Sequence, residues 1–151
     1  MKNILYLLII ITSVISSCKP SAPIEKNDSI VGTWKLVSGL IIKGKDSVLT
    51  DYTHNQEMIK IITNTNFAFF RHDLTKGQEP NPIFVAGGGS CVIKDNNYIE
   101  NLEYCNYREW ENNSFEFTYY ISGDTLITQG VETVEELKID QFNIETYIRI
   151  N

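Results

Sequence analysis

The chain is poor in the residues that bind metals, form disulfide frameworks or contact nucleic acid. It has three cysteines and two histidines in 151 residues, and His54 and His72 stand in no recognised metal-site spacing. It has 13 Lys and Arg against 19 Asp and Glu, a net charge of −6, so nucleic acid would be repelled and is not an expected partner. No nucleophile–base motif is present. The sequence therefore predicts no metal, no cofactor and no catalytic residues, and a protein that is not an enzyme.

The apolar run near the start of the chain, residues 4–11, is too short to span a membrane. A transmembrane helix needs about 20 apolar residues. Lys2 before the run and small residues after it are typical of a secretory signal peptide. Residues 15–18, Ile-Ser-Ser-Cys, resemble the lipobox of bacterial lipoproteins, in which the peptide is cut before the cysteine. We predict a signal peptide over residues 1–17 and an acylated Cys18; an ordinary signal peptide cut elsewhere is the alternative.

An acylated Cys18 would fix the chain to a membrane of the bacterial cell envelope. Each buried methylene contributes about 0.8 kcal/mol, so several acyl chains, palmitate among them, attach a protein stably. The outer membrane is the expected location, with the side of the membrane left open. Residues 18–29 are polar and contain proline, which predicts a disordered tether. Residues 30–151 have the size of one domain, large enough to bury a core without a metal or disulfide.

Cys91 and Cys105 are the other two cysteines. An oxidising envelope would permit a disulfide between them. A turn at residues 96–97 would place Cys91 opposite Leu102, with Cys105 on the other face of its strand, since strand side chains alternate. We therefore predict two buried thiols rather than a bridge.

From residue 30 onward, short β-rich segments alternate with turn residues. The segments expected as strands are 30–38, 57–63, 67–71, 83–86, 91–94, 98–104, 114–121, 125–130 and 143–150. Residues 131–138 fit either a capped helix start or a strand, and the glycine triplet at 87–89 predicts a bend or bulge. The pattern predicts an all-β protein, an antiparallel up-and-down barrel of about 8–10 strands whose closure removes both sheet edges.

A family resemblance supports the barrel. The landmarks are G-T-W-K-L-V at 32–37, the glycine triplet at 87–89, Tyr98-Ile-Glu100, G-D-T-L at 123–126 and E-T-Y-I-R at 145–149. The first is similar to the G-x-W opening of lipocalins, and the ordered set resembles the lipocalin-like lipoproteins of Bacteroides-type bacteria, a family grouped as a domain of unknown function. The resemblance implies that Trp34 plugs the closed end of a barrel and that Gly32 lets the backbone approach it. Tyr147 stands where the family pattern has tryptophan and Cys91 where it has a bulkier ring, and both departures change the interior.

Trp34 and Arg149 are candidates for a contact between the first and last strands. If the barrel closes, these strands are neighbours, and the guanidinium can stack on the indole. The alternative comes from the resemblance to fatty-acid-binding relatives. Tyr147 and Arg149 lie two residues apart on one face, so together they could hold an anionic head group.

The remaining candidates for ligand contact come from three strands. Tyr98 and Glu100 share a face, and a buried glutamate needs a partner, for which Arg149 is a candidate, or a place at the rim. Phe117 and Tyr119 alternate with polar residues and are expected to face inward. The predicted ligand-binding set is Tyr98, Glu100, Phe117, Tyr119, Tyr147 and Arg149. The inward-facing members of Phe67, Phe69 and Phe70 are left open.

Two functions follow from these features. In the first, the barrel binds a small hydrophobic or amphipathic ligand, which an interior cavity above roughly 300 Å³ would favour. In the alternative, the barrel is a packed scaffold that contacts another envelope protein through loops 72–82 and 106–113. Tyr107 and Trp110 in the second loop motivate the alternative, because aromatic residues are enriched at interfaces.

Overall fold

The computed structural model describes residues 29–150; the predicted signal peptide, the predicted lipid-attachment residue Cys18 and most of the predicted tether lie outside them. The strands are β1 (Gly32–Lys43), β2 (Asp46–Asp51), β3 (Gln56–Ile62), β4 (Asn66–Asp73), β5 (Phe84–Lys94), β6 (Asn97–Cys105), β7 (Asn113–Ser122), β8 (Thr125–Val134) and β9 (Ile139–Ile150). Two short 3-10 helices, η1 (Arg108–Trp110) and η2 (Glu135–Leu137), interrupt the loops. Within the described range, no helix is long and apolar enough to cross a membrane.

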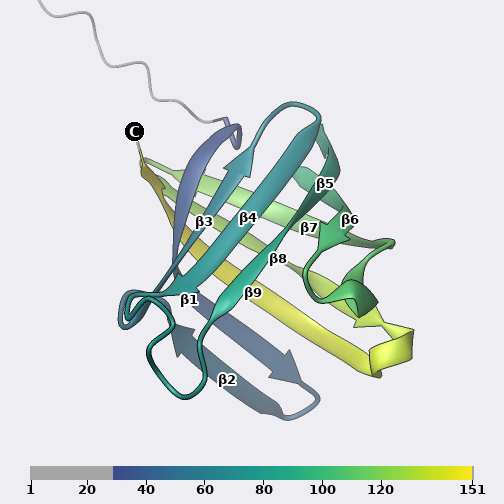
Figure 1. Ribbon diagram of the computed structural model, residues 1–151. Coiled ribbons are helices and arrows are strands. Elements are labelled where there is room, and N and C mark those ends of the chain that lie inside the picture. Colours follow the sequence, from purple (N-terminus) through teal and green to yellow (C-terminus); the bar gives the residue numbers. More distant parts are fainter. Residues whose placement is uncertain (1–28, 151) are drawn as a thin grey trace, which may run out of the picture.

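Eight of the strands close into a barrel. From β3 to β9 every strand pairs antiparallel with the next one in the sequence, and β1 closes the ring by pairing with β9 from Thr33↔Ile150 to Ile42↔Phe142. Figure 1 shows β1 and β9 side by side, with the long strands wrapped around one interior. The predicted all-β, up-and-down, lipocalin-like barrel is confirmed.

Strand β2 lies outside this ring. The first half of β1 pairs with β3 and its second half, residues 38–43, pairs with β2, so the β1–β2 hairpin projects away from the barrel at the bottom of Figure 1. The expectation that closure removes both edges is therefore wrong for β2. Val48 and Leu49 on this edge strand are 62% and 72% exposed, and Asp46 and Asp51 at its ends supply the charges that discourage edge-to-edge pairing.

The two ends of the barrel differ in their connections. Tight turns at residues 63–65, 95–96 and 123–124 gather at the end where β1 begins and β9 finishes. The opposite end carries the longer loops, at residues 74–83 and 106–112. The end with the tight turns is the closed end, beneath Trp34, and the end with the longer loops is the open end.

The β5–β6 hairpin differs from the prediction by two residues. Lys94 pairs with Asn97, so Asp95 and Asn96 form the turn and Cys91 lies opposite Glu100. Asp95 takes the left-handed conformation, with φ of 54°, which aspartate and asparagine tolerate better than most residues. The predicted register, with Cys91 opposite Leu102, is wrong.

The glycine triplet explains where the second cysteine lies. The β5–β6 register shifts between Gly88 and Gly89, as expected for a bulge. A Cβ at Gly89 would lie 2.0 Å from the Asn101 carbonyl oxygen, so only glycine fits this close approach. The bulge returns Cys105 to the buried side, and the expectation that it faces the other way is wrong. Cys91 and Cys105 are both buried, free thiols, as predicted.

The two segments left open by the sequence are resolved by the barrel. Residues 131–134 continue strand β8, and only η2 beyond them is helical. In β4, Phe67 is buried, Phe69 packs against the core and Phe70 is 43% exposed. Strand alternation therefore assigns Phe67 and Phe69 to the interior.

Asp73, the last residue of β4, organises the loop at 74–83. Its Oδ1 accepts hydrogen bonds from the Thr75 N–H (3.1 Å), the Thr75 hydroxyl (2.9 Å) and the Gly77 N–H (2.7 Å), and its Oδ2 accepts one from the Ile83 N–H (2.8 Å). The backbone bonds from Gly77 and Ile83 are the largest causes that lower the pKa of Asp73 to about 2 from 3.8. The ionised carboxylate is thus an integral part of the loop.

Asp73→Asn is expected to lower the melting temperature above pH 4, because the amide places donors opposite backbone N–H groups. A lowered folded-state pKa stabilises the fold above the unfolded value of 3.8, and this contribution is lost as pH falls through about 2. The difference in melting temperature between the two chains should therefore disappear near pH 2 in calorimetric scans. Asp140→Asn, at an exposed strand position, is the control. A constant difference across the pH range would contradict this role of Asp73.

Candidate ligand-binding site

The closed end of the barrel is sealed by Trp34. The indole is completely buried, and its Nε1–H donates to the Ile30 carbonyl oxygen at 2.7 Å. The Arg149 guanidinium lies 4.0 Å from the ring centroid and donates to the Val31 carbonyl oxygen at 3.1 Å. A Cβ at Gly32 would lie 2.5 Å from Arg149 Nη1. The expected contact between the first and last strands is therefore present, and Gly32 provides the space for the arginine.

This placement separates Arg149 from the polar groups deeper in the barrel. Tyr147 is completely buried, and its hydroxyl donates to Glu145 at 2.5 Å. The guanidinium instead covers the indole at the closed end. The structure does not bring the Tyr147 hydroxyl and Arg149 together as a clamp for an anionic head group.

An ion network crosses the middle of the interior. Lys60 on β3 is 4% exposed and Glu100 on β6 is 6% exposed, and Lys60 Nζ lies 2.8 Å from Glu100 Oε1 and 3.7 Å from Glu145 Oε2. The ammonium also lies 5.6 Å from the ring centroid of Tyr147 and 6.0 Å from that of Phe117. The buried Glu100 thus has the cationic partner that it requires, and that partner is Lys60 rather than Arg149.

The network fixes the protonation of its members. Burial alone would lower the pKa of Lys60, but the charges of Glu100 and Glu145 outweigh it and raise the pKa. Burial, then the charge of Glu145, raises the pKa of Tyr147, and burial, then the charge of Glu100, raises that of Tyr98. The Tyr98 hydroxyl is buried, and within the described range no group meets it in hydrogen-bonding geometry. Lys60 is therefore a charged ammonium and both phenols are neutral.

A cavity of about 380 Å³ opens at the open end of the barrel. Its aromatic lining comes from Tyr52, Phe69, Tyr107 and Trp110, and its aliphatic lining from Ile41, Met58, Val85 and Leu102. An inner chamber of about 120 Å³ lies between this cavity and the Lys60 network. The outer cavity and the inner chamber share six lining residues: Met58, Phe69, Leu102, Trp110, Glu132 and Glu145. The two spaces are therefore adjoining parts of one site.

Two aromatic side chains shape the mouth of the cavity. Trp110, on η1, packs against Phe115 with ring centroids 6.1 Å apart and is partly buried against the core. Tyr52 lies against Gly39, where a Cβ would be 3.2 Å from its ring. Trp110 therefore lines the interior of the barrel, whereas the scaffold hypothesis expected it at an outer surface.

Glu132 is a carboxylate of the cavity wall without a cation beside it. Its Oε2 accepts a hydrogen bond from Gln141 Nε2 at 2.7 Å, and its Oε1 accepts one from Asn143 Nδ2 at 3.0 Å. Burial is the largest cause that raises the pKa of Glu132, and the charge of Glu145 raises it further. Across residues 29–150, no lysine or arginine lies within ion-pair distance of it.

The structure distributes the predicted ligand-binding residues over different depths. Glu100 and Phe117 line the inner chamber. Tyr98 and Tyr147 are core residues behind it. The Tyr119 hydroxyl donates to the Asp95 carbonyl oxygen at 2.8 Å, which places it at the closed end with Arg149.

Sequence reasoning missed Lys60, Glu132 and Glu145 as interior groups. Strand alternation was the available signal for Lys60, because Met58, Lys60 and Ile62 share one face of β3. Glu145 lies two residues from the inward Tyr147, so the same rule applied to it. The sequence pattern did not single out any of the three, because charged residues in strands usually face solvent.

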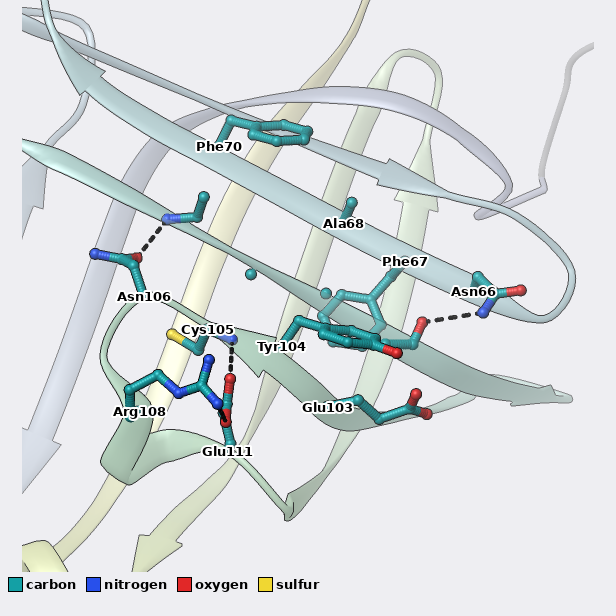
Figure 2. Close-up of a pocket in the computed structure, with 14 residues that line it drawn as sticks. Asn66, Phe67, Ala68, Phe70, Glu103, Tyr104, Cys105, Asn106, Arg108 and Glu111 are labelled. Carbon is teal, nitrogen blue, oxygen red and sulfur yellow. Dashed lines mark hydrogen bonds and ion pairs between the residues drawn. The ribbon is translucent and has the colours of Figure 1, made fainter.

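A second hollow lies on the outer face of the barrel. This shallow groove of about 720 Å³ crosses β4, β5 and β6 above the glycine triplet, and Figure 2 shows Phe70 and Tyr104 on its two sides. Phe70 is 43% and Tyr104 is 69% exposed. The Asn106 side-chain oxygen accepts from the Ala86 N–H at 2.7 Å (Figure 2). The groove exists because three successive residues of β5 have no side chain.

No group of potential metal ligands occurs in the part of the chain that the structure covers. Comparisons of the chain with family models, curated proteins and solved structures find no match. The chemistry of the cavity is therefore the available guide to its function.

Proposed function

We propose that this chain is an envelope-anchored lipoprotein whose barrel binds a small hydrophobic or amphipathic ligand. The anchor is supported by the lipobox-like residues 15–18 and by the ordered landmarks that resemble lipocalin-like lipoproteins. Binding is supported by one observation above the others: the interior is hollow at the open end. Its volume of about 380 Å³ falls in the range of small-molecule sites, roughly 300–1,000 Å³.

The lining explains which molecules would enter. Aromatic and aliphatic side chains form most of the outer wall, with Arg71 at the mouth, while the carboxylates Glu132 and Glu145 line both the outer cavity and the inner chamber. An apolar body would therefore fill the outer cavity, where each buried methylene contributes about 0.8 kcal/mol. A polar end would reach the carboxylates below. The expected ligand is a molecule with both parts.

Binding is tested by titrating the purified full chain with N-phenylnaphthylamine, an uncharged probe that fluoresces in apolar sites. We expect saturable binding, weakened at least about tenfold by Val85→Trp, because Val85 lines the cavity and an indole there fills it. Val92→Trp is the matched control, since Val92 lies on the same strand but is 52% exposed. Absence of saturable binding to the unaltered chain, or equal binding to both variants, would contradict the proposal.

The scaffold alternative is favoured by the outer groove rather than by the predicted loops. Phe70 and Tyr104 present exposed rings across β4–β6, and exposed apolar patches are typical of protein contacts. Substituting Tyr107 and Trp110 would not separate the two functions, because both residues line the cavity. Failure of the probe to bind would favour this alternative.

A further inference from the structure

We propose that the ligand of this cavity is a cation: a primary amine or quaternary ammonium group on an apolar body, received by Glu132 and the aromatic rings of the mouth. The inference depends on the proposed ligand-binding function and adds the sign of the ligand's charge. It is opposite to the anionic head group considered for Tyr147 and Arg149.

The deepest basic group of the cavity, Lys60, is already paired with carboxylates, and the other, Arg71, holds the neutral side chain of Gln56. Lys60 is held by Glu100 at 2.8 Å and by Glu145 at 3.7 Å. Arg71, at the mouth, donates from Nε to Gln56 Oε1 at 2.8 Å, and its guanidinium lies 5.0 Å from the Tyr52 ring centroid. An anionic ligand would have to compete with Glu100 and Glu145 for the deepest cation, at the cost of separating a buried ion pair.

Carboxylates exceed cations around the inner chamber. Glu100, Glu132 and Glu145 line it with a single basic residue, Lys60. Lys60 pairs with Glu100 and Glu145. Glu132 receives hydrogen bonds only from neutral amide donors. Burial and the nearby Glu145 raise the pKa of Glu132, and the two amides and the more distant charge of Lys60, which lower it, do not offset them. A ligand cation would give Glu132 an ionic partner: a primary ammonium through a charge-assisted hydrogen bond, the stronger kind, and a quaternary ammonium through its charge alone.

The aromatic rings favour the same charge. Tyr52, Phe69, Tyr107 and Trp110 line the outer cavity, and an ammonium over such rings gains about 0.5–2 kcal/mol. The protein already uses this arrangement deeper in the barrel, where the Lys60 ammonium lies over Phe117 and Tyr147. Aromatic walls that end at a carboxylate are suited to an amine with an apolar body.

The test compares octylamine, octanol and octanoate as competitors of N-phenylnaphthylamine on the full chain at neutral pH. The three share one apolar chain and differ in the charge of the head group. We expect octylamine to displace the probe at about tenfold lower concentration than octanol, and octanoate to be the weakest. Glu132→Gln, which is nearly isosteric, should remove most of the advantage of the amine over the alcohol. Glu116→Gln removes the same charge from the exposed outer face and should leave that advantage intact.

Each outcome decides between the two proposals. Tightest displacement by octanoate, or equal displacement by all three, would overturn the cationic ligand while leaving the binding function in place. An amine preference that survives Glu132→Gln would remove Glu132 from the inference. If Glu132→Gln does not fold, the ranking on the unaltered chain still decides the sign of the charge. Failure of the probe itself to bind would instead count against the proposed function.

Discussion

Lys60→Met is expected to lower the free energy of unfolding by about 3–5 kcal/mol, because removing one partner of a buried ion pair leaves the other charge without compensation. Lys60 is almost fully buried, and Glu100 and Glu145 both face its ammonium. Methionine keeps an unbranched apolar side chain, so the loss reports on the charge rather than on the removal of bulk. Urea unfolding at neutral pH measures the difference.

Two further variants make this result specific. Adding Glu100→Gln and Glu145→Gln to Lys60→Met should restore most of the stability, since neutral amides no longer require a cation. Lys94→Met, at an exposed position of β5, should change stability by less than about 0.5 kcal/mol. A loss below about 1 kcal/mol for Lys60→Met, or no recovery in the triple variant, would contradict a structural ion network in the interior.

Trp34→Ala is expected to cost about 3–5 kcal/mol of the free energy of unfolding, the range for a buried large aromatic residue replaced by alanine. The indole is fully buried at the seam between β1 and β9. Its removal leaves a cavity at the closed end and takes away the ring on which Arg149 lies. Urea unfolding again measures the loss.

The second tryptophan of the chain is the matched control. Trp110 is half-buried at the open end, where the cavity already separates it from much of the interior. Trp110→Ala should therefore cost clearly less stability than Trp34→Ala, while weakening probe binding more. Equal losses of stability would show that the closed end is not the more tightly packed one.

The sequence predicted those features that depend on strand alternation and barrel closure. Once the barrel is inferred, the first and last strands must be neighbours, which places Arg149 beside Trp34. The inward sides of β6 and β7 follow from alternation, and Tyr98 and Phe117 are buried as expected; Glu100 takes the buried position of the two that were left open. These predictions needed only local patterns and one rule of topology.

The features that were missed depend on long-range contacts or on local backbone geometry. Lys60 looks like a solvent-facing charge until Glu100, which is 40 residues away in the sequence, is seen to pair with it. The side on which Cys105 lies depends on a bulge whose position the glycine triplet indicates only approximately. The predicted partner of Cys91 is wrong by two residues, because Asp95 and Asn96 form the turn in place of Asn96 and Asn97. Neither charge pairing nor turn position is fixed by alternation.

The most direct test of ligand entry into the barrel uses Met58. It is one of two methionines in the chain, the other being Met1, and it lines both the outer cavity and the inner chamber. In a chain labelled with carbon-13 at methionine methyl groups, titration with N-phenylnaphthylamine should shift the Met58 methyl resonance along a saturable curve. An unmoved Met58 signal at a probe concentration that saturates the fluorescence would place the probe elsewhere and contradict binding inside the barrel.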